Sequence, residues 1–126
     1  MVAPWLFVLM TVLGGAIRPG YNHISDTISE LMSPGSPNKL LLDILYTTFA
    51  ILLILFGFGI LQLVQKTQTN QRIGKTGAFL FIAVGCLSVL TATIFPQDPS
   101  KSTPTFAGEM HMRVSGMIGL LSIFYM

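Results

Sequence analysis

The stretch that decides the fold is GAFLFIAVGCLSVLTATIF, residues 77–95, which carries no charged side chain along its whole length. A bilayer core about 30 Å thick needs about 20 helical residues, and this stretch meets that length. Within hydrocarbon a backbone must satisfy its own polar groups, which favours a helix over an open strand. We therefore predict that residues 77–95 form a membrane-spanning helix.

Three further apolar segments lie on either side of this stretch, at residues 2–17, 40–64 and 112–126. Residues 40–64 are also long enough to span a bilayer, residues 2–17 are borderline, and the last segment is still apolar where the sequence ends. We predict an all-α transmembrane helical bundle with four spanning segments in a single domain, residues 1–126. We also expect an incomplete bundle, with further C-terminal helices of the same protein as partners.

Residues 2–17 have an alternative interpretation as a cleaved secretory signal, in which Gly14, Gly15 and Ala16 supply the small residues of a cleavage site. No lysine or arginine precedes the apolar run, although a signal peptide ordinarily begins with a basic region. We favour a spanning helix, and the sequence alone leaves the alternative open.

The composition excludes several classes of protein. The chain is 52% hydrophobic and only 10% charged, whereas soluble domains carry roughly 25% charged residues. The net charge of +2 comes with no basic stripe, so we expect no nucleic-acid partner. The main partner is the lipid bilayer, and small residues at helical spacing (Ala78, Gly85, Ala92) favour close helix packing, within the bundle or in a homo-oligomer.

The distribution of basic residues predicts the topology. Residues 65–76 hold Lys66, Arg72 and Lys75 and no acid, so the positive-inside rule places this loop in the cytoplasm. The N-terminus is then cytoplasmic as well, and loops 18–39 and 96–111 are external. We predict a multi-pass protein of the cell (plasma) membrane.

The sidedness of the polar residues does not depend on that orientation. Two crossings separate loops 18–39 and 96–111, so both loops lie on the same face of the membrane. This face receives Arg18 and every acid and histidine of the chain: His23, Asp26, Glu30, Asp43, Asp98, Glu109 and His111. Such a concentration of carboxylates and imidazoles indicates a candidate binding or catalytic site on this face.

Residues 22–32 are expected to form a short amphipathic helix at the membrane surface. Four apolar residues fall at helical spacing and four polar ones take the opposite face: Ile24, Ile28, Leu31 and Met32 against Ser25, Asp26, Ser29 and Glu30. The simplest interpretation is that the polar face meets water. Asp43, two turns into the next helix, is expected at headgroup level or paired with Arg18 or Lys39.

Three functions compete for the polar face. In the first, a cluster binds lipid or a partner protein: Arg18, His23, Asp26, Ser29, Glu30, Asp98 and His111. In the second, a membrane-embedded hydrolase cleaves a lipid headgroup. There His23, Asp98 and His111 hold a divalent metal, and Asp26 or Glu30 acts as general base. The spacing of these ligands matches no known metal motif. In the third, a small transporter uses Asp43 and Arg18.

Two motifs carry a family resemblance. One is YNHISDTISEL at residues 21–31, followed by PGSP at residues 34–37, and the other is FPQD at residues 95–98, followed by His111. Together they resemble bacterial membrane proteins grouped as domain of unknown function 998. The resemblance covers nearly the whole chain and implies a bundle of about six spanning helices. It implies no activity, cofactor or substrate.

Overall fold

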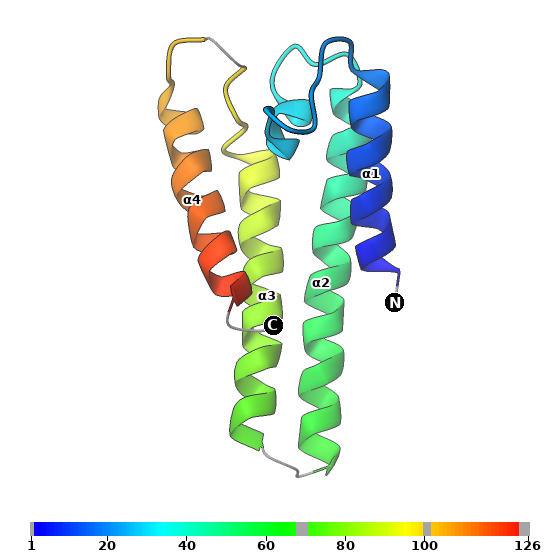
Figure 1. Ribbon diagram of the computed structural model, residues 1–126. Coiled ribbons are helices and arrows are strands. Elements are labelled where there is room, and N and C mark those ends of the chain that lie inside the picture. Colours follow the sequence, from blue (N-terminus) through cyan, green and yellow to red (C-terminus); the bar gives the residue numbers. More distant parts are fainter. Residues whose placement is uncertain (1, 68–70, 100–101, 124–126) are drawn as a thin grey trace.

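The computed structural model describes residues 2–67, 71–99 and 102–123. Within them the chain is all-α, as predicted, and no strand is present. The elements are α1 (Ala3–Ile17), a 3-10 helix η1 (Ile28–Met32), α2 (Lys39–Thr67), α3 (Gln71–Thr93) and α4 (Phe106–Ile123). Figure 1 shows α2 and α3 as a long central pair, with α1 against α2 and α4 against α3.

Two glycines bring α2 and α3 into close contact. A Cβ atom at Gly57 would lie 2.9 Å from the backbone oxygen of Ala78, and one at Gly85 would lie 2.9 Å from that of Ala50. Each helix therefore presents a small residue to the backbone of the other, at two levels of the contact. This is the arrangement by which small residues let helix backbones approach in lipid.

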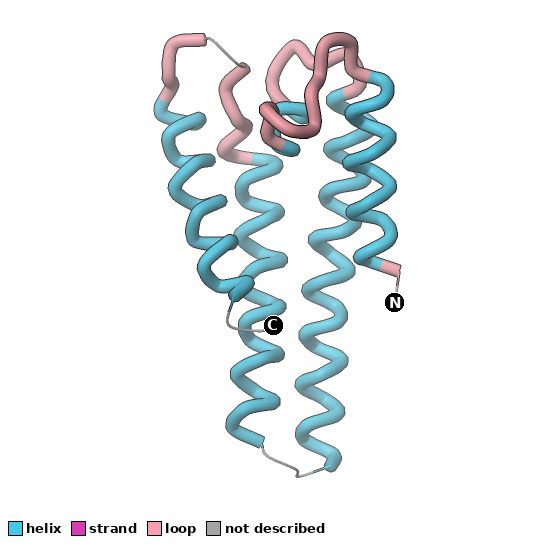
Figure 2. Tube along the Cα trace, in the orientation of Figure 1, coloured by secondary structure: helices cyan, strands magenta, loops and turns pink. Residues whose placement is uncertain are grey.

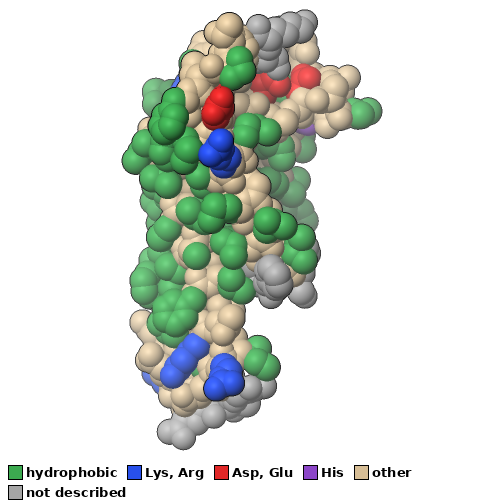
Figure 3. All heavy atoms as spheres, turned by 90° about the vertical axis from the view of Figure 1, so that its left-hand side faces the viewer, with side chains coloured by type: hydrophobic (Ala, Val, Ile, Leu, Met, Phe, Trp, Pro, Cys, Tyr) green, Lys and Arg blue, Asp and Glu red, His purple; other side chains and the backbone are tan. Residues whose placement is uncertain are grey.

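The surface of the central pair is apolar and exposed. α2 and α3 are long and apolar enough to cross a membrane, and α1 is apolar but shorter. Only 11% of the most apolar part of α2 and 28% of that of α3 are buried inside the protein, whereas a core helix of a soluble protein is mostly buried. Figure 3 shows apolar side chains covering the middle of the molecule, with charged side chains towards its ends.

Three helix boundaries, the end of α2 and the starts of α3 and α4, differ from the prediction by three residues or more. The expected loop at residues 65–76 is helical up to Thr67 and again from Gln71, because its lysines and glutamines are good helix formers. Within it, Lys75 donates a hydrogen bond to Gln71 one turn earlier (3.1 Å). α4 begins at Phe106, before the predicted start at residue 112, since Thr105 accepts a hydrogen bond from the Gly108 amide (3.2 Å) and so caps the helix.

The predicted amphipathic helix over residues 22–32 is wrong in its first half. Only residues 28–32 are helical, as η1. The Asp26 carboxylate accepts a hydrogen bond from the backbone amide of Asn22 (2.8 Å), and the side-chain oxygen of Asn22 accepts one from the backbone amide of Ile24 (2.9 Å). These side-chain bonds to backbone compete with helix formation. Figure 2 shows this loop and the one that precedes α4 at the same end of the bundle.

Candidate functional site at the polar end

The polar end comprises residues 18–38 and 94–105 with the adjoining first turns of α2 and α4. Arg18, directly after α1, holds η1 in place. Its Nη1 donates to the Glu30 backbone oxygen, and its Nη2 lies 3.8 Å from the Glu30 carboxylate. Glu30 is therefore only 7% exposed. The expectation that Glu30 faces water is wrong, because a neighbouring arginine stabilises its burial.

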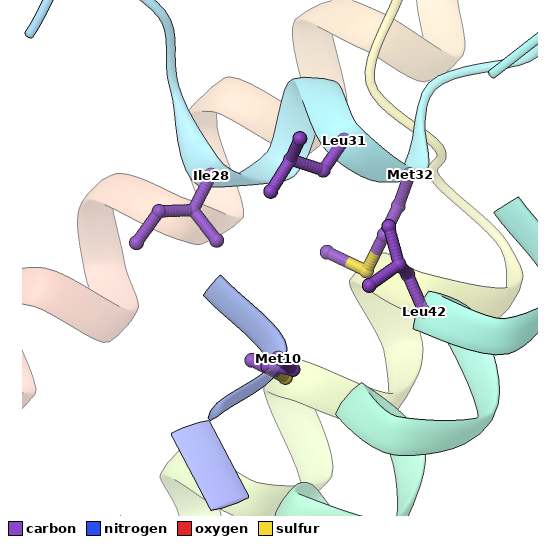
Figure 4. Close-up of a pocket in the computed structure, with 5 residues that line it drawn as sticks. All are labelled: Met10, Ile28, Leu31, Met32 and Leu42. Atoms are coloured by element: carbon purple, nitrogen blue, oxygen red, sulfur yellow. The ribbon is translucent and has the colours of Figure 1, made fainter. Parts of the chain in front are cut away.

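The apolar side of η1 packs between α1 and α2. Figure 4 shows five side chains converging there: Met10, Ile28, Leu31, Met32 and Leu42. Leu31 is 1% exposed and forms a buried core with Met10 and Leu42. Two serine hydroxyls donate to η1 carbonyl oxygens, Ser33 to Glu30 (2.8 Å) and Ser36 to Leu31 (2.7 Å). Packing and hydrogen bonds together hold η1 in place between α1 and α2.

His23 and Asp26 lie on the outer side of this loop. The His23 ring contacts Tyr21 edge to face, with centroids 4.9 Å apart, and lies against Gly15 of α1. Asp26 accepts hydrogen bonds from the Asn22 amide and the Ser25 hydroxyl, and these bonds lower the pKa of its carboxyl. Asp26 is therefore a turn-forming carboxylate and a weaker base than an ordinary aspartate.

Asp98 organises the start of α4. Its carboxylate accepts hydrogen bonds from the Thr105 amide (2.7 Å) and hydroxyl (2.8 Å). Both bonds lower the pKa of the carboxyl. The carboxylate also lies against Gly108, where a Cβ atom would meet it at 2.0 Å. Asp98 thus closes the loop before α4, and both of its carboxylate oxygens accept hydrogen bonds from Thr105, one from the backbone amide and one from the hydroxyl.

His111 is the most deeply placed ionisable group from α4, with 6% exposure. Its Nδ1 lies 2.7 Å from the backbone oxygen of Phe95. Because a carbonyl oxygen only accepts hydrogen bonds, Nδ1 must carry the hydrogen. In the neutral ring Nε2 is then a hydrogen-bond acceptor, and it is buried with no partner among the described residues.

His111 lines a cleft between η1, α2 and the end of α3. The lining residues are Ser29, Met32, Asp43, Tyr46, Thr91, Ala92, Pro96, Gln97 and His111. Asp43 forms an ion pair with Lys39 through Oδ2, as one of the two expected pairings, while its Oδ1 is buried and unpartnered within the described chain. The cleft therefore contains two residues whose buried acceptor atoms lack donors.

One contact beside the cleft joins the two loops, through Gln97, which lines the cleft, and Thr27. The Gln97 amide donates to the Thr27 hydroxyl (2.9 Å), and the Thr27 hydroxyl oxygen lies 3.1 Å from Gln97 Oε1. These residues are 70 positions apart in the sequence. The sequence pattern assigned neither residue to the site, because nothing local in it indicates such a long-range pair.

The structure divides the predicted cluster. Arg18 pairs with Glu30, and Ser29 shares the cleft with His111. The three predicted metal ligands have separate surroundings. His23 lies against Gly15 of α1, Asp98 accepts hydrogen bonds from Thr105, and His111 donates to the Phe95 carbonyl oxygen just after α3. In residues 2–67, 71–99 and 102–123, no group of three or more His, Cys, Asp or Glu side chains could hold a metal ion.

These features define the class: an all-helical bundle with an exposed apolar surface and a fixed polar end that contains a cleft. Residues 1–126 match the family described as "Protein of unknown function (DUF998)", and the chain belongs to that family. The resemblance of the two loop motifs is thereby confirmed. No curated protein and no solved structure matches the chain.

Proposed function

We propose that the chain is a multi-pass protein of the cell membrane and that its polar end binds a lipid headgroup in the cleft beside His111. α1, α2, α3 and α4 are the four spans. Loops 18–39 and 96–111 are external, and the N-terminus and residues 65–76 are cytoplasmic. The single observation that carries headgroup binding is the cleft, with two buried acceptors that have no donor among the described residues.

The apolar exterior supports membrane residence. Large side chains are exposed along all four helices, among them Trp5 (75%), Leu55 (59%), Phe79 (59%) and Leu120 (63%). Exposing such a continuous apolar surface to water is unfavourable at about 25 cal/mol per Å². At a rise of 1.5 Å per residue, α3 is about 35 Å long and matches a bilayer core. The shorter α1 is accommodated by local thinning of the bilayer.

The position of the cleft supports a lipid ligand. Asp43 lies one turn into α2, beside Lys39 at its start, which is the depth of the headgroups in the four-span arrangement. A buried polar atom without a hydrogen bond costs about 1–3 kcal/mol. A headgroup that donates hydrogen bonds to His111 and Asp43 offsets that cost.

The two alternatives have less support. The hydrolase requires His23, Asp98 and His111 to converge on one ion, and they lie in three separate environments. The transporter requires Asp43 and Arg18 to form a path, and each of them is paired with another residue at the same end.

Lipid retention tests the proposal. The protein is extracted in a mild detergent, and lipid bound per chain is measured by native mass spectrometry. We expect the parent to retain lipid and Ala92→Phe, which fills the cleft, to lose it. Gly77→Phe is the matched control, since no described residue apart from the local backbone of α3 lies within 4 Å of a Cβ atom at Gly77. Circular dichroism verifies folding of both variants. Equal retention by the two folded variants would contradict headgroup binding in the cleft.

A further inference from the structure

We infer that the cleft selects a primary ammonium group, and that phosphatidylethanolamine is the lipid that supplies it. This inference rests on the proposed function, because it names the headgroup that the same cleft binds. It is carried by the chemistry of the atoms that lack partners, by the charge of the polar end and by the size of the space.

The cleft is rich in acceptors. In the neutral ring, His111 Nε2 is an acceptor because Nδ1 donates to Phe95, and Asp43 Oδ1 is a carboxylate oxygen. Thr91, which also lines the cleft, donates its hydroxyl hydrogen to the Ser88 carbonyl oxygen (2.9 Å). The Thr91 oxygen is thereby left as an acceptor. A ligand that fits these three residues must donate several hydrogen bonds, and a primary ammonium carries three N–H donors.

The charge of the polar end favours a cation. Residues 18–43 and 94–113 hold all five acids of the chain but only four of its seven basic residues: Arg18, Lys39, Lys101 and Arg113. The remaining three basic residues lie at the opposite end of α2 and α3. Lys39, which is not one of the lining residues, engages one oxygen of Asp43, and the other oxygen has no donor among the described residues. A carboxylate with one free oxygen can bridge two cations.

The size of the cleft favours a small head. The space enclosed by its lining residues admits about one water-sized group. An ammonium has that size. The trimethylammonium of phosphatidylcholine is larger and has no N–H donor, so it neither fits nor satisfies the acceptors. The cleft is therefore expected to distinguish two lipids that differ only in methylation of the nitrogen.

Graded methylation of the headgroup tests the inference. The full chain in nanodiscs or detergent is titrated with phosphatidylethanolamine, its N-methyl and N,N-dimethyl forms and phosphatidylcholine, and bound lipid is counted by native mass spectrometry. We expect affinity to fall at each methylation, with a total loss of about tenfold or more, the equivalent of about 1.4 kcal/mol. Free ethanolamine at equal concentration should compete poorly.

Matched variants assign the preference to the cleft. Asp43→Asn and the nearly isosteric Thr91→Val should each reduce the preference for phosphatidylethanolamine over phosphatidylcholine at least threefold. Glu109→Gln makes the same charge change on an exposed side chain of α4 outside the cleft, and should keep the preference. Circular dichroism and size-exclusion chromatography verify that each variant folds. If both folded cleft variants keep the full preference, the inference is overturned.

The remaining outcomes separate this inference from the proposed function. Equal binding of all four lipids would overturn ammonium selection and leave headgroup binding intact. Absence of binding by every lipid would overturn both. Competition by free ethanolamine as strong as that by the lipid would overturn the choice of phosphatidylethanolamine, since a small amine would then be the ligand.

Discussion

Replacement of Gly57 by alanine tests the close contact between α2 and α3. An added Cβ atom would lie 2.7 Å from Ile82 Cγ1, 2.9 Å from the Ala78 backbone oxygen and 3.1 Å from the Ile82 amide nitrogen. Carbon atoms pack best at about 3.5–4.0 Å. The isoleucine side chain can rotate away, but the backbone atoms cannot, so the helices must separate. Overpacking of this kind costs about 1–3 kcal/mol.

Gly59→Ala is the matched control for this change. Gly59 lies two residues further along α2 on its exposed side, where no described residue apart from the local backbone of α2 lies within 4 Å of an added Cβ atom. Both substitutions exchange glycine for alanine inside the same helix, so the gain in helix propensity of about 0.8–1.0 kcal/mol is common to them. The difference between the two variants isolates the packing cost, and we expect Gly57→Ala to be less stable by about 1–3 kcal/mol.

The assay is reversible unfolding in mixed micelles, followed by far-UV circular dichroism, with the free energy of unfolding compared between the two variants. A second variant, Gly85→Ala, should behave like Gly57→Ala, because its Cβ atom would meet Ala50 and Ile54 in the reciprocal way. The Gly57→Ala/Gly85→Ala double variant should lose less than the sum, since the first substitution already parts the helices. Equal stability of Gly57→Ala and Gly59→Ala would refute the close approach of α2 and α3.

Three further predictions concern the polar end and use the same unfolding assay. Arg18→Gln should cost about 1–3 kcal/mol, since it leaves the buried Glu30 without its cation, and adding Glu30→Gln should restore part of the loss; no restoration would argue against the ion pair. Leu31→Ala should lower the free energy of unfolding by about 2–5 kcal/mol, whereas Ile24→Ala, at a 96% exposed position, should change it by no more than about 0.5 kcal/mol. Similar losses for the two variants would contradict the burial of Leu31 between α1 and α2. The folded-state pKa of Asp98 is lowered by hydrogen bonds, so its stabilising effect is present above the ordinary value of 3.8 and disappears as the pH falls through the folded value. Asp98→Asn should therefore lose less stability on acidification than the parent, and identical acid sensitivity would contradict the assignment.

The helices could be predicted from the sequence because a hydrocarbon solvent leaves a strong signal. Residues 77–95 contain no charge, and residues 40–64 contain one acid. The ends of the helices were harder to predict. Basic residues after position 65 were assigned to a loop from their charge, yet lysine and arginine are compatible with a helix that extends beyond the bilayer core. Hydropathy indicates where the apolar segment ends, but the helical backbone of α2 and α3 extends beyond that point, to Thr67 and from Gln71.

The loop before α2 shows why the site was only partly predictable. Its apolar residues follow a helical period, and that pattern placed Leu31 on the apolar side of a helix at the membrane surface, whereas Leu31 is buried against Met10 and Leu42. The pattern could not show that the Asn22 and Asp26 side chains bond to backbone amides, which competes with a continuous helix over residues 22–27. It also could not show that Arg18 draws Glu30 into the interior. Both outcomes depend on competition between hydrogen-bond partners, which periodicity does not report.

The cleft itself depends on contacts between distant parts of the chain. His111 was predicted as a member of the polar binding cluster and, in the hydrolase alternative, as a metal ligand with His23 and Asp98. Its actual neighbours come from η1, α2 and α3, and its Nδ1 is occupied by the Phe95 carbonyl. Asp43 gave the clearest available signal, since a carboxylate inside an apolar helix requires partners. The sequence offered Arg18 and Lys39 as partners, of which the structure shows Lys39, and it gave no indication of the cleft beside them.

Site-directed cysteine labelling tests whether the chain crosses the membrane four times with its polar end on the outer face. Cys86 is first replaced by serine, and single cysteines are then introduced at Thr67 and Ser102, beside the two loops that should lie on opposite faces. In intact cells an impermeant thiol reagent should label Ser102→Cys only, and Thr67→Cys should react only after the membrane is opened. Labelling of both cysteines from the same side, or release of the protein from membranes by alkaline carbonate, would contradict the account.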